Sequence, residues 1–124
     1  MTIFVVDDDP GICRLVATTL EQEGFSVLTA NNGLEAMALW RSKHRQVDLL
    51  ITDMTMPHMD GPVLARRLAT DDPGIRVLFI SGERDTTELR EFQYSGFLGK
   101  PFNRSTLIAE VSRLLQFHAT TAVC

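Results

Sequence analysis

The side chains that could take part in chemistry come directly after short apolar runs. They are three carboxylates, one hydroxyl and one ammonium, carried by Asp7, Asp8, Asp53, Ser81 and Lys100. In an open parallel sheet, ligands bind outside the carboxyl ends of the strands. If the runs are strands of such a sheet, these side chains meet at one edge. Singly, each could be a helix cap, a turn residue or an exposed lysine, and it is their joint placement that predicts a site.

The residue types suit the transfer of a phosphoryl group with the help of a divalent cation. Three neighbouring carboxylates repel one another, which raises their pKa values unless a cation lies among them. Oxygen ligands of this kind suit Mg²⁺. Lys100 supplies a positive charge, and Ser81 a hydrogen-bond donor, for phosphoryl oxygens. One carboxylate can then attack phosphorus as a nucleophile, in a reaction that mostly requires positioning and neutralisation of charge.

Short apolar runs alternate with segments of helical spacing along the chain. Several runs are continuous rather than alternating, as expected of strands buried on both faces of a parallel sheet. The predicted strands are Ile3–Val6, Phe25–Leu28, Val47–Thr52, Val77–Ile80 and Phe97–Leu98. The β-α pattern repeats five times, which predicts an α/β sandwich with right-handed crossovers. The second strand delivers no comparable polar side chain and is therefore expected at the outside of the sheet.

Capping residues and apolar stripes mark the helices. The residues expected to cap helix N-termini are Asp9, Asn32, Asp60, Asp85 and Asn103. Helix ends are marked by Gly24 and by Asp72-Pro73-Gly74. The first helix carries the stripe Ile12, Leu15, Val16 and Leu20, and the last carries Leu107, Ile108, Val111, Leu114 and Leu115. Residues 118–124 have no periodic pattern, so we expect a domain over residues 1–117 and a flexible C-terminal tail.

Composition excludes several classes of protein. The chain has 124 residues, of which 44% are hydrophobic and 23% charged, as in one ordinary globular domain. The net charge of −4 and the scattered basic residues argue against direct nucleic-acid binding. No apolar run could span a membrane, and the N-terminus lacks the basic region of a signal peptide. Cys13 and Cys124 are expected to be free thiols, which favours a cytoplasmic location.

Other residues that could bind a ligand are expected to have structural roles. The three histidines, His44, His58 and His118, show no ligand spacing and are predicted at the surface. Met54, Met56, Met59 and Trp40 are predicted to pack in the core rather than to bind a cofactor.

The motifs around the candidate site resemble those of the receiver domains of two-component response regulators, over residues 2–117. They are Val5-Val6-Asp7-Asp8-Asp9, Asp53-Met54-Thr55-Met56-Pro57-His58-Met59-Asp60-Gly61, Ser81-Gly82 and Lys100-Pro101-Phe102. The second and the fourth, in this order and at this spacing, are highly specific. The resemblance implies a flavodoxin-like (βα)5 fold, a three-layer sandwich whose five-stranded parallel sheet has the order 2-1-3-4-5.

The resemblance also implies a role for each site residue. Asp53 would accept the phosphoryl group, Lys100 would pair with that group, and Ser81 would hydrogen-bond it after transfer. The cation would be Mg²⁺, with Mn²⁺ as an alternative. Its ligands would be Asp8, Asp53, the backbone carbonyl of Thr55 and, through water, Asp7.

Further residues would govern switching. Phe97 would be the switch aromatic, buried or exposed according to the state of the Ser81 hydroxyl. Thr55 and Glu83 would tune the hydrolysis of the phosphoaspartate, and Pro101 would follow a cis peptide bond. Phosphorylation adds negative charge and strong acceptor oxygens, which would draw in Ser81 and its loop. The face made by the fourth helix, fifth strand and fifth helix would then change by a population shift.

The sequence departs from the family pattern in four respects. Ser81 replaces the more frequent threonine, and Gly82 replaces the usual alanine, which loosens the loop. The segment between Ser81 and Lys100 is shorter than in the chemotaxis-type members, which would shorten the fourth helix. Phe97 lacks the hydroxyl of the tyrosine found in other members, so its switch would depend on packing alone.

The resemblance implies a signalling domain rather than an enzyme, although one that assists its own phosphorylation and dephosphorylation. The expected partner is a sensor histidine kinase or a histidine phosphotransfer protein, with a homodimer through the switching face as a further option. The chain would be a stand-alone receiver or part of a larger regulator or hybrid kinase. One alternative is a degenerate receiver that binds partners without phosphorylation. The other, an aspartate-nucleophile phosphatase, needs a second aspartate where this chain has Thr55, and a cap domain besides.

Overall fold

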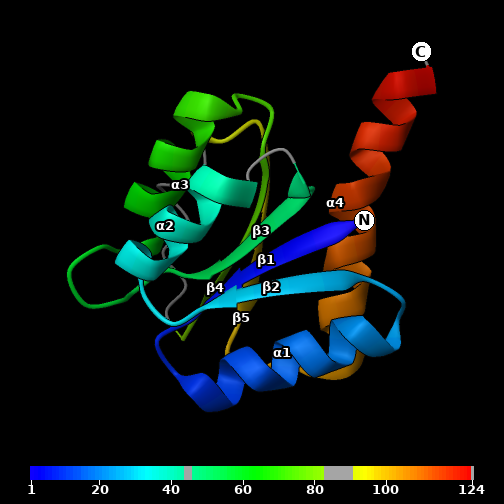
Figure 1. The fold of residues 1–124 in the computed structure, drawn as a ribbon. Helices are drawn as coiled ribbons and strands as arrows, with labels where there is room; N and C mark the ends of the chain where they lie inside the picture. The colour runs from blue at the N-terminus through cyan, green and yellow to red at the C-terminus, as the bar shows by residue number, and fades with distance from the viewer. Residues whose placement is uncertain (44–45, 83–90, 124) are drawn as a thin grey trace.

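The computed structural model describes residues 1–43, 46–82 and 91–123. Five parallel strands form one sheet in the order β2-β1-β3-β4-β5 (Figure 1), which confirms the predicted flavodoxin-like order. The strands are β1 (Thr2–Val6), β2 (Ser26–Ala30), β3 (Leu49–Asp53), β4 (Arg76–Ser81) and β5 (Tyr94–Gly99). The helices in the described part of the chain are α1 (Pro10–Gln22), α2 (Gly33–Lys43), α3 (Gly61–Asp71) and α4 (Arg104–Val123).

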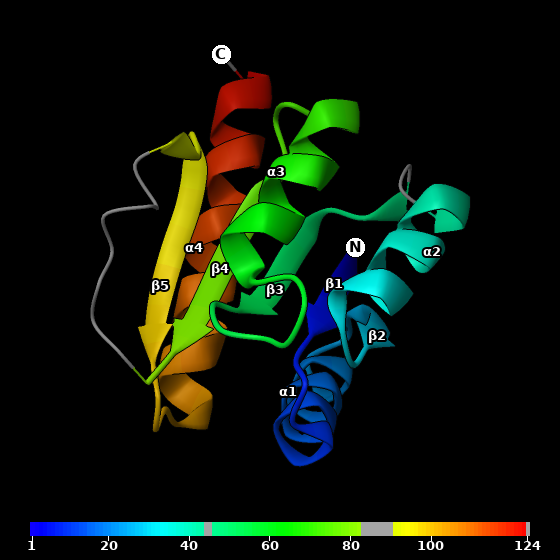
Figure 2. The same cartoon turned by 90° about the vertical axis from the view of Figure 1, so that its left-hand side faces the viewer.

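The helices form a layer on each face of the sheet. Figures 1 and 2 show α2 and α3 on one face and α1 and α4 on the other. β2 lies at one edge of the sheet, as its lack of polar site residues predicts, and β5 lies at the other. The predicted fourth helix and its expected cap Asp85 fall on residues 83–90, outside the described residues, so α4 corresponds to the predicted fifth helix.

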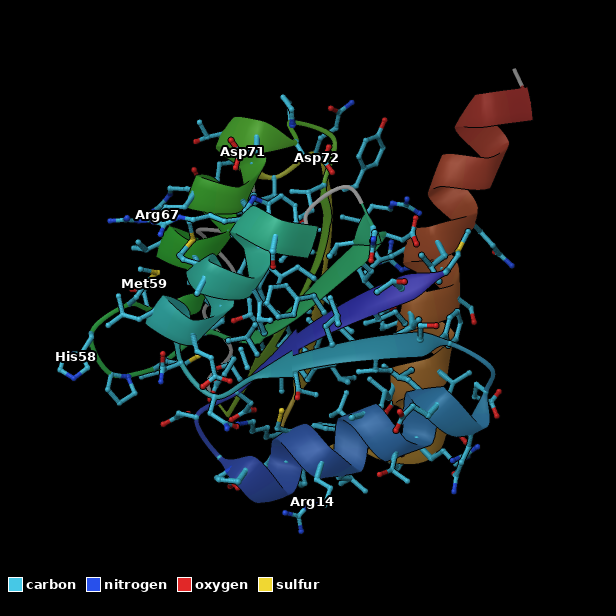
Figure 3. All side chains as sticks on the ribbon, in the orientation of Figure 1. Arg14, His58, Met59, Arg67, Asp71 and Asp72 are labelled. Atoms are coloured by element: carbon cyan, nitrogen blue, oxygen red, sulfur yellow. The ribbon has the colours of Figure 1, made fainter. Side chains whose placement is uncertain are left out.

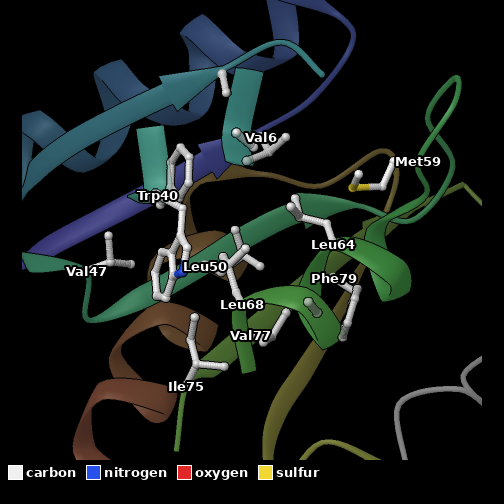
Figure 4. Close-up of a cluster of buried hydrophobic side chains, with 14 of the residues drawn as sticks. Val6, Trp40, Val47, Leu50, Met59, Leu64, Leu68, Ile75, Val77 and Phe79 are labelled. Carbon is white, nitrogen blue, oxygen red and sulfur yellow. The ribbon is translucent and has the colours of Figure 1, made fainter. Parts of the chain in front are cut away.

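The inner strands are buried on both faces, which explains their continuous apolar sequences. In β1, Phe4 and Val6 join a core cluster beneath α2 and α3, whereas Ile3 and Val5 join a second cluster beneath α1 and α4. Figure 4 shows the first cluster, in which Trp40 packs between α2 and the sheet. The sheet is therefore packed between two apolar cores, and room for polar side chains is left at the ends of its strands.

The expected caps are present at every described helix N-terminus. Asp9 Oδ1 accepts from the Gly11 N–H at 2.8 Å, and Asn32 Oδ1 accepts from the Glu35 N–H at 2.8 Å. Asp60 caps α3, and Asn103 Oδ1 accepts from the Thr106 N–H of α4 at 2.9 Å. Each cap satisfies a backbone donor that the helix itself leaves without a partner.

The structure differs from the sequence pattern at two helices. Leu15, predicted on the buried stripe of α1, has 54% of its surface exposed, because the buried face is formed by Cys13, Val16, Ala17, Thr19 and Leu20. The prediction for Leu15 was wrong, since the core-facing stripe of α1 is centred on Val16 and Leu20. α4 continues to Val123 although residues 118–124 show no periodic pattern, and the domain boundary at residue 117 stays a prediction.

Cys13 is a buried free thiol, and the predicted packing of Trp40, Met56 and Met59 is confirmed by their burial. None of the helices in the described ranges combines the length and the apolar character needed to span a membrane.

Candidate functional site

The carboxyl ends of four strands deliver the predicted site residues to one edge of the sheet. Asp7 follows β1, Asp53 and Ser81 are the last residues of β3 and β4, and Lys100 follows β5. Parallel pairing holds these ends level, with Asp53 opposite Ile80 and Ser81 opposite Gly99. The backbone N–H of Lys100 also donates to the Ser81 carbonyl at 2.8 Å.

The three carboxylates form one cluster. Asp7, Asp8 and Asp53 each place a carboxylate oxygen within 4.8 Å of the others. Asp7 and Asp53 are buried, whereas Asp8 is exposed. The predicted grouping is therefore present, with two carboxylates inside the molecule and one at its surface.

Lys100 lies over the two buried carboxylates. Its Nζ is 3.3 Å from Asp53 Oδ2 and 3.6 Å from Asp7 Oδ2. The first distance is that of a hydrogen bond and the second that of a longer ion pair. One ammonium thus faces two buried carboxylates, so the cluster keeps an excess of negative charge.

Backbone donors fix the second oxygen of each buried carboxylate. Asp7 Oδ1 accepts from the Asp9 N–H at 2.8 Å, and Asp53 Oδ1 accepts from the Thr55 N–H at 3.3 Å. Asp7 Oδ2, in contrast, is buried without a hydrogen-bond partner, alone in this respect among the side chains that the structure describes. A buried acceptor left in this way costs free energy unless another group, such as a cation, contacts it.

The pKa values of these groups reflect burial and crowding of like charge. Burial raises the pKa of Asp7, and the neighbouring charge of Asp53 adds to the effect. Burial also raises the pKa of Asp53, although Lys100 opposes the shift. For Lys100, burial lowers the pKa, but the charges of Asp7 and Asp53 together outweigh it, so the pKa is raised. Lys100 is therefore charged, while Asp7 and Asp53 hold their protons more tightly than an exposed carboxyl does.

This donor set fits a small divalent cation. It offers oxygen atoms alone, at least two of them from carboxylates that carry uncompensated charge, and such sites suit Mg²⁺. Within the described part of the chain, Asp7 Oδ2 has no hydrogen bond and is contacted only by the longer ion pair to Lys100, so a cation could contact it. Asp7, Asp8 and Asp53 are thus the residues that could hold the ion. The predicted ligand role of the Thr55 carbonyl stays a prediction.

The remaining predicted residues lie at or near the site. Ser81 is buried at the end of β4, next to the carboxyl end of β3. Phe97 of β5 is half-buried opposite Phe79 and packs against the core cluster beneath α2 and α3. Glu83 lies outside the described residues. The Lys100–Pro101 peptide bond is cis, as predicted.

Sequence reasoning missed two features of the loop that joins β3 to α3. His58, correctly predicted at the surface and seen there in Figure 3, has a φ of 70°, and the Met59 N–H donates to the Pro57 carbonyl across it at 2.8 Å. Gly61, named above only as the last residue of the Asp53–Gly61 motif and given no role there, packs its Cα against the backbone of Asp53. A residue-by-residue reading gives no signal for either, because both depend on how the loop folds back.

The chain matches a known family over most of its length. The family model described as "Response regulator receiver domain" matches residues 3–112. The chain is 34% identical to the response regulator receiver protein CpdR of Brucella abortus, over 91% of this chain and 95% of that protein. It is 31% identical to the sensor kinase CckA of the same organism, over 93% of this chain and 12% of the kinase.

Solved structures agree with this likeness. The chemotaxis protein CheY4 of Vibrio cholerae superposes with a TM-score of 0.85 at 29% identity, covering 92% of this chain and 98% of CheY4. The chain therefore spans nearly the whole of CpdR and CheY4, but about an eighth of the length of CckA.

Proposed function

The chain belongs to the family of response regulator receiver domains, and on that premise we propose that Asp53 is its phosphoacceptor. The observation that carries the proposal is the surroundings of this one carboxylate. Asp53 is flanked by the carboxylates of Asp7 and Asp8, and its Oδ2 contacts the ammonium of Lys100 at 3.3 Å. A nucleophile, a set of cation ligands and a fixed positive charge thus come together.

The reaction is the transfer of a phosphoryl group from a phosphohistidine. An oxygen of the Asp53 carboxylate attacks phosphorus and forms a P–O bond. The P–N bond to the donor imidazole breaks, and its electron pair stays on the nitrogen, which takes a proton from solvent. The product is an acyl phosphate on Asp53 and a free histidine on the donor. Most of the barrier to such a transfer is lowered by positioning and by neutralisation of charge.

Asp8, Asp53 and the backbone carbonyl of Thr55 would hold Mg²⁺ or Mn²⁺, with Asp7 contributing through water. When bound, the cation neutralises charge on phosphoryl oxygens and on the carboxylates. Burial lowers the pKa of Lys100, but the charges of Asp7 and Asp53 raise it by more. Lys100 therefore stays protonated and can contact the same phosphoryl oxygens. Thr55 and Glu83 occupy the positions that would tune the hydrolysis of the acyl phosphate, a reaction that the domain would itself assist.

Switching would run from Ser81 to β5. The new phosphoryl oxygens would draw the Ser81 hydroxyl toward Asp53, and Phe97 would fill the space left behind. Because Phe97 lies in β5 and packs against the core cluster beneath α2 and α3, its movement would change the face made by β5, α4 and the predicted fourth helix. The change is a shift between two populations rather than a new fold.

The proposed donor is a sensor histidine kinase or a histidine phosphotransfer protein. CckA, a sensor kinase, and CpdR, a receiver protein, are both similar to this chain, which supports a role in such a relay. A second copy of the chain, bound through the face of the predicted fourth helix, β5 and α4, is a further proposed partner.

The test is the intact mass of the protein after incubation with acetyl phosphate, with and without Mg²⁺. One phosphoryl adduct that requires Mg²⁺ and is absent from Asp53→Asn supports the proposal. Asp60→Asn is the matched control, because asparagine keeps the cap of α3 and removes an exposed carboxylate from the same loop. Mg²⁺ binding without any adduct would favour the degenerate receiver, and turnover of a simple phosphate ester would favour the phosphatase.

A further inference from the structure

Gly61, the first residue of α3, packs against the backbone that carries the phosphoacceptor. A Cβ added to Gly61 would overlap the Asp53 carbonyl oxygen and lie 3.0 Å from Met54 Cα. Both of these atoms belong to the main chain, which cannot turn aside as a flexible side chain can. Gly61 is buried, so no larger residue fits unless the end of β3 or the start of α3 moves.

The same stretch of backbone is held on its other side by β4. Asp53 is paired with Ile80, and the Met54 N–H donates to the Ile80 carbonyl at 2.9 Å. On the near side, the Gly61 N–H donates to the Met54 carbonyl at 2.9 Å. Met54, the residue after the acceptor, is therefore hydrogen-bonded through its N–H to β4 and through its carbonyl to the first turn of α3.

The first turn of α3 has little freedom to withdraw. Asp60 caps the helix by accepting from the Val63 N–H at 2.9 Å, and Pro62 and Leu64 are buried. Leu64 belongs to the core cluster beneath α2 and α3. A side chain at position 61 would thus press on the backbone of Asp53 and Met54, because the start of α3 has little room to withdraw.

We propose that Gly61 is a positioning residue, which sets where the Asp53 carboxylate stands relative to Asp7, Asp8 and Lys100. The proposal rests on the function proposed above. The tolerance is small, because Asp53 must keep an oxygen within 4.8 Å of its acidic neighbours and 3.3 Å from Lys100 Nζ. Misplacement of a reacting group by about 1 Å can cost a factor of about 100 in rate.

The test compares Gly61→Ala with Gly74→Ala. Gly74 is exposed, and a Cβ there would meet its nearest neighbour, Asp72 Oδ1, at an ordinary 3.8 Å. Three quantities are measured: the Mg²⁺ dissociation constant by calorimetry, the rate of labelling by acetyl phosphate at saturating Mg²⁺, and the ¹⁵N–¹H spectrum without metal. For Gly61→Ala we expect weaker Mg²⁺ binding, labelling slowed by about tenfold or more, and shifted amide signals of Met54, Thr55 and Ile80. Gly74→Ala should behave as the original chain.

The test must distinguish a general loss of stability in Gly61→Ala from a displacement of the Asp53 carboxylate. Val111→Ala, which removes buried atoms beneath α1 and α4, destabilises the fold without touching the site and should label at the original rate while folded. If Gly61→Ala unfolds, the measurements are repeated in trimethylamine N-oxide, which favours compact states. Normal Mg²⁺ affinity and labelling in folded Gly61→Ala would overturn the proposal. So would a variant that stays unfolded in the osmolyte, since Gly61 would then serve folding as a whole.

The outcome is separable from failure of the proposed function. If the original chain takes no phosphoryl group, the proposed function is wrong and the labelling rate gives no information about Gly61. The Mg²⁺ affinities and the amide signals of Gly61→Ala still report whether Gly61 positions Asp53, because neither requires phosphorylation.

Discussion

At the scale of single residues, the acidic cluster lowers the stability of the metal-free chain. Burial and the charge of Asp53 raise the pKa of Asp7, and Asp7 Oδ2 is buried without a hydrogen bond. We therefore expect Asp7→Asn to raise the free energy of unfolding in metal-free buffer at neutral pH, by on the order of 1 kcal/mol. Urea denaturation followed by circular dichroism measures the change.

The pH dependence of this gain follows from the direction of the shift. The folded-state pKa of Asp7 lies above the ordinary 3.8. Well below pH 3.8, Asp7 is protonated in both the folded and the unfolded chain. Between pH 3.8 and the folded-state pKa, Asp7 is ionised in the unfolded chain but still protonated in the folded one, so the free energy of unfolding falls as the pH rises. The gain from Asp7→Asn should thus be largest at neutral pH and shrink as the buffer is acidified, with Asp60→Asn as the control. An equal gain at all pH values would show that ionisation is not the cause.

Lys100 contacts oxygens of Asp7 and Asp53, for which a cation in the acidic cluster would have to compete. Lys100 Nζ lies 3.3 Å from Asp53 Oδ2 and 3.6 Å from Asp7 Oδ2. Lys100→Met should still bind Mg²⁺, and more tightly by about tenfold or 1.4 kcal/mol, while the phosphorylated variant should fail to switch. Calorimetric titration with Mg²⁺ measures the affinity, and Arg67→Met, which removes an exposed cation on α3, is the control. Weaker binding to the lysine variant would contradict this account.

At the scale of elements, the helix that follows Lys100 begins with a reciprocal cap. Asn103 Oδ1 accepts from the Thr106 N–H at 2.9 Å, and Thr106 Oγ1 accepts from the Asn103 N–H at 3.2 Å. Asn103→Ala should lower the free energy of unfolding by about 1 kcal/mol. Thermal denaturation of this variant beside Ser105→Ala, an exposed neighbour in the same turn, measures the difference. Equal stabilities would mean that the cap contributes little.

The elements also show what the sequence could and could not predict. Residues whose role depends on chain position alone were predictable: Asp9 and Asn103 as caps, and Asp53 at the end of a buried strand. Leu15 was misplaced, because an apolar residue at helical spacing can lie outside the buried arc of α1. Gly61 and the left-handed His58 were missed, because their roles arise from tertiary contacts of the loop between β3 and α3. The hydrogen bond from Trp40 Nε1 to Asp71 Oδ2 at 2.9 Å joins α2 to α3 and was likewise unpredictable.

At the scale of the whole molecule, the two apolar cores stabilise the fold and the acidic cluster destabilises it. The inner strands β1, β3 and β4 bury apolar side chains on both faces, while their carboxyl ends hold like charges together at one edge. A sheet fixed between two cores can carry such a cluster because its strand ends cannot move apart to relieve the repulsion. The stability of the whole chain should therefore respond to a ligand at that edge.

Mg²⁺ should accordingly raise the melting temperature of the protein. A ligand that binds the native state alone stabilises it by about 2.7 kcal/mol at 100 times its dissociation constant, which for a domain of this size is a rise of roughly 10 °C. K⁺ at equal ionic strength should have a much smaller effect, because it screens charge without the geometry of a bound dication. Asp8→Asn separates binding from general screening: Asp8 is exposed, so its loss should change the metal-free melting temperature little while removing most of the rise with Mg²⁺. An equal rise in the original chain and in Asp8→Asn would place the bound cation away from the acidic cluster, and the assignment of the cluster as the metal site would then be wrong.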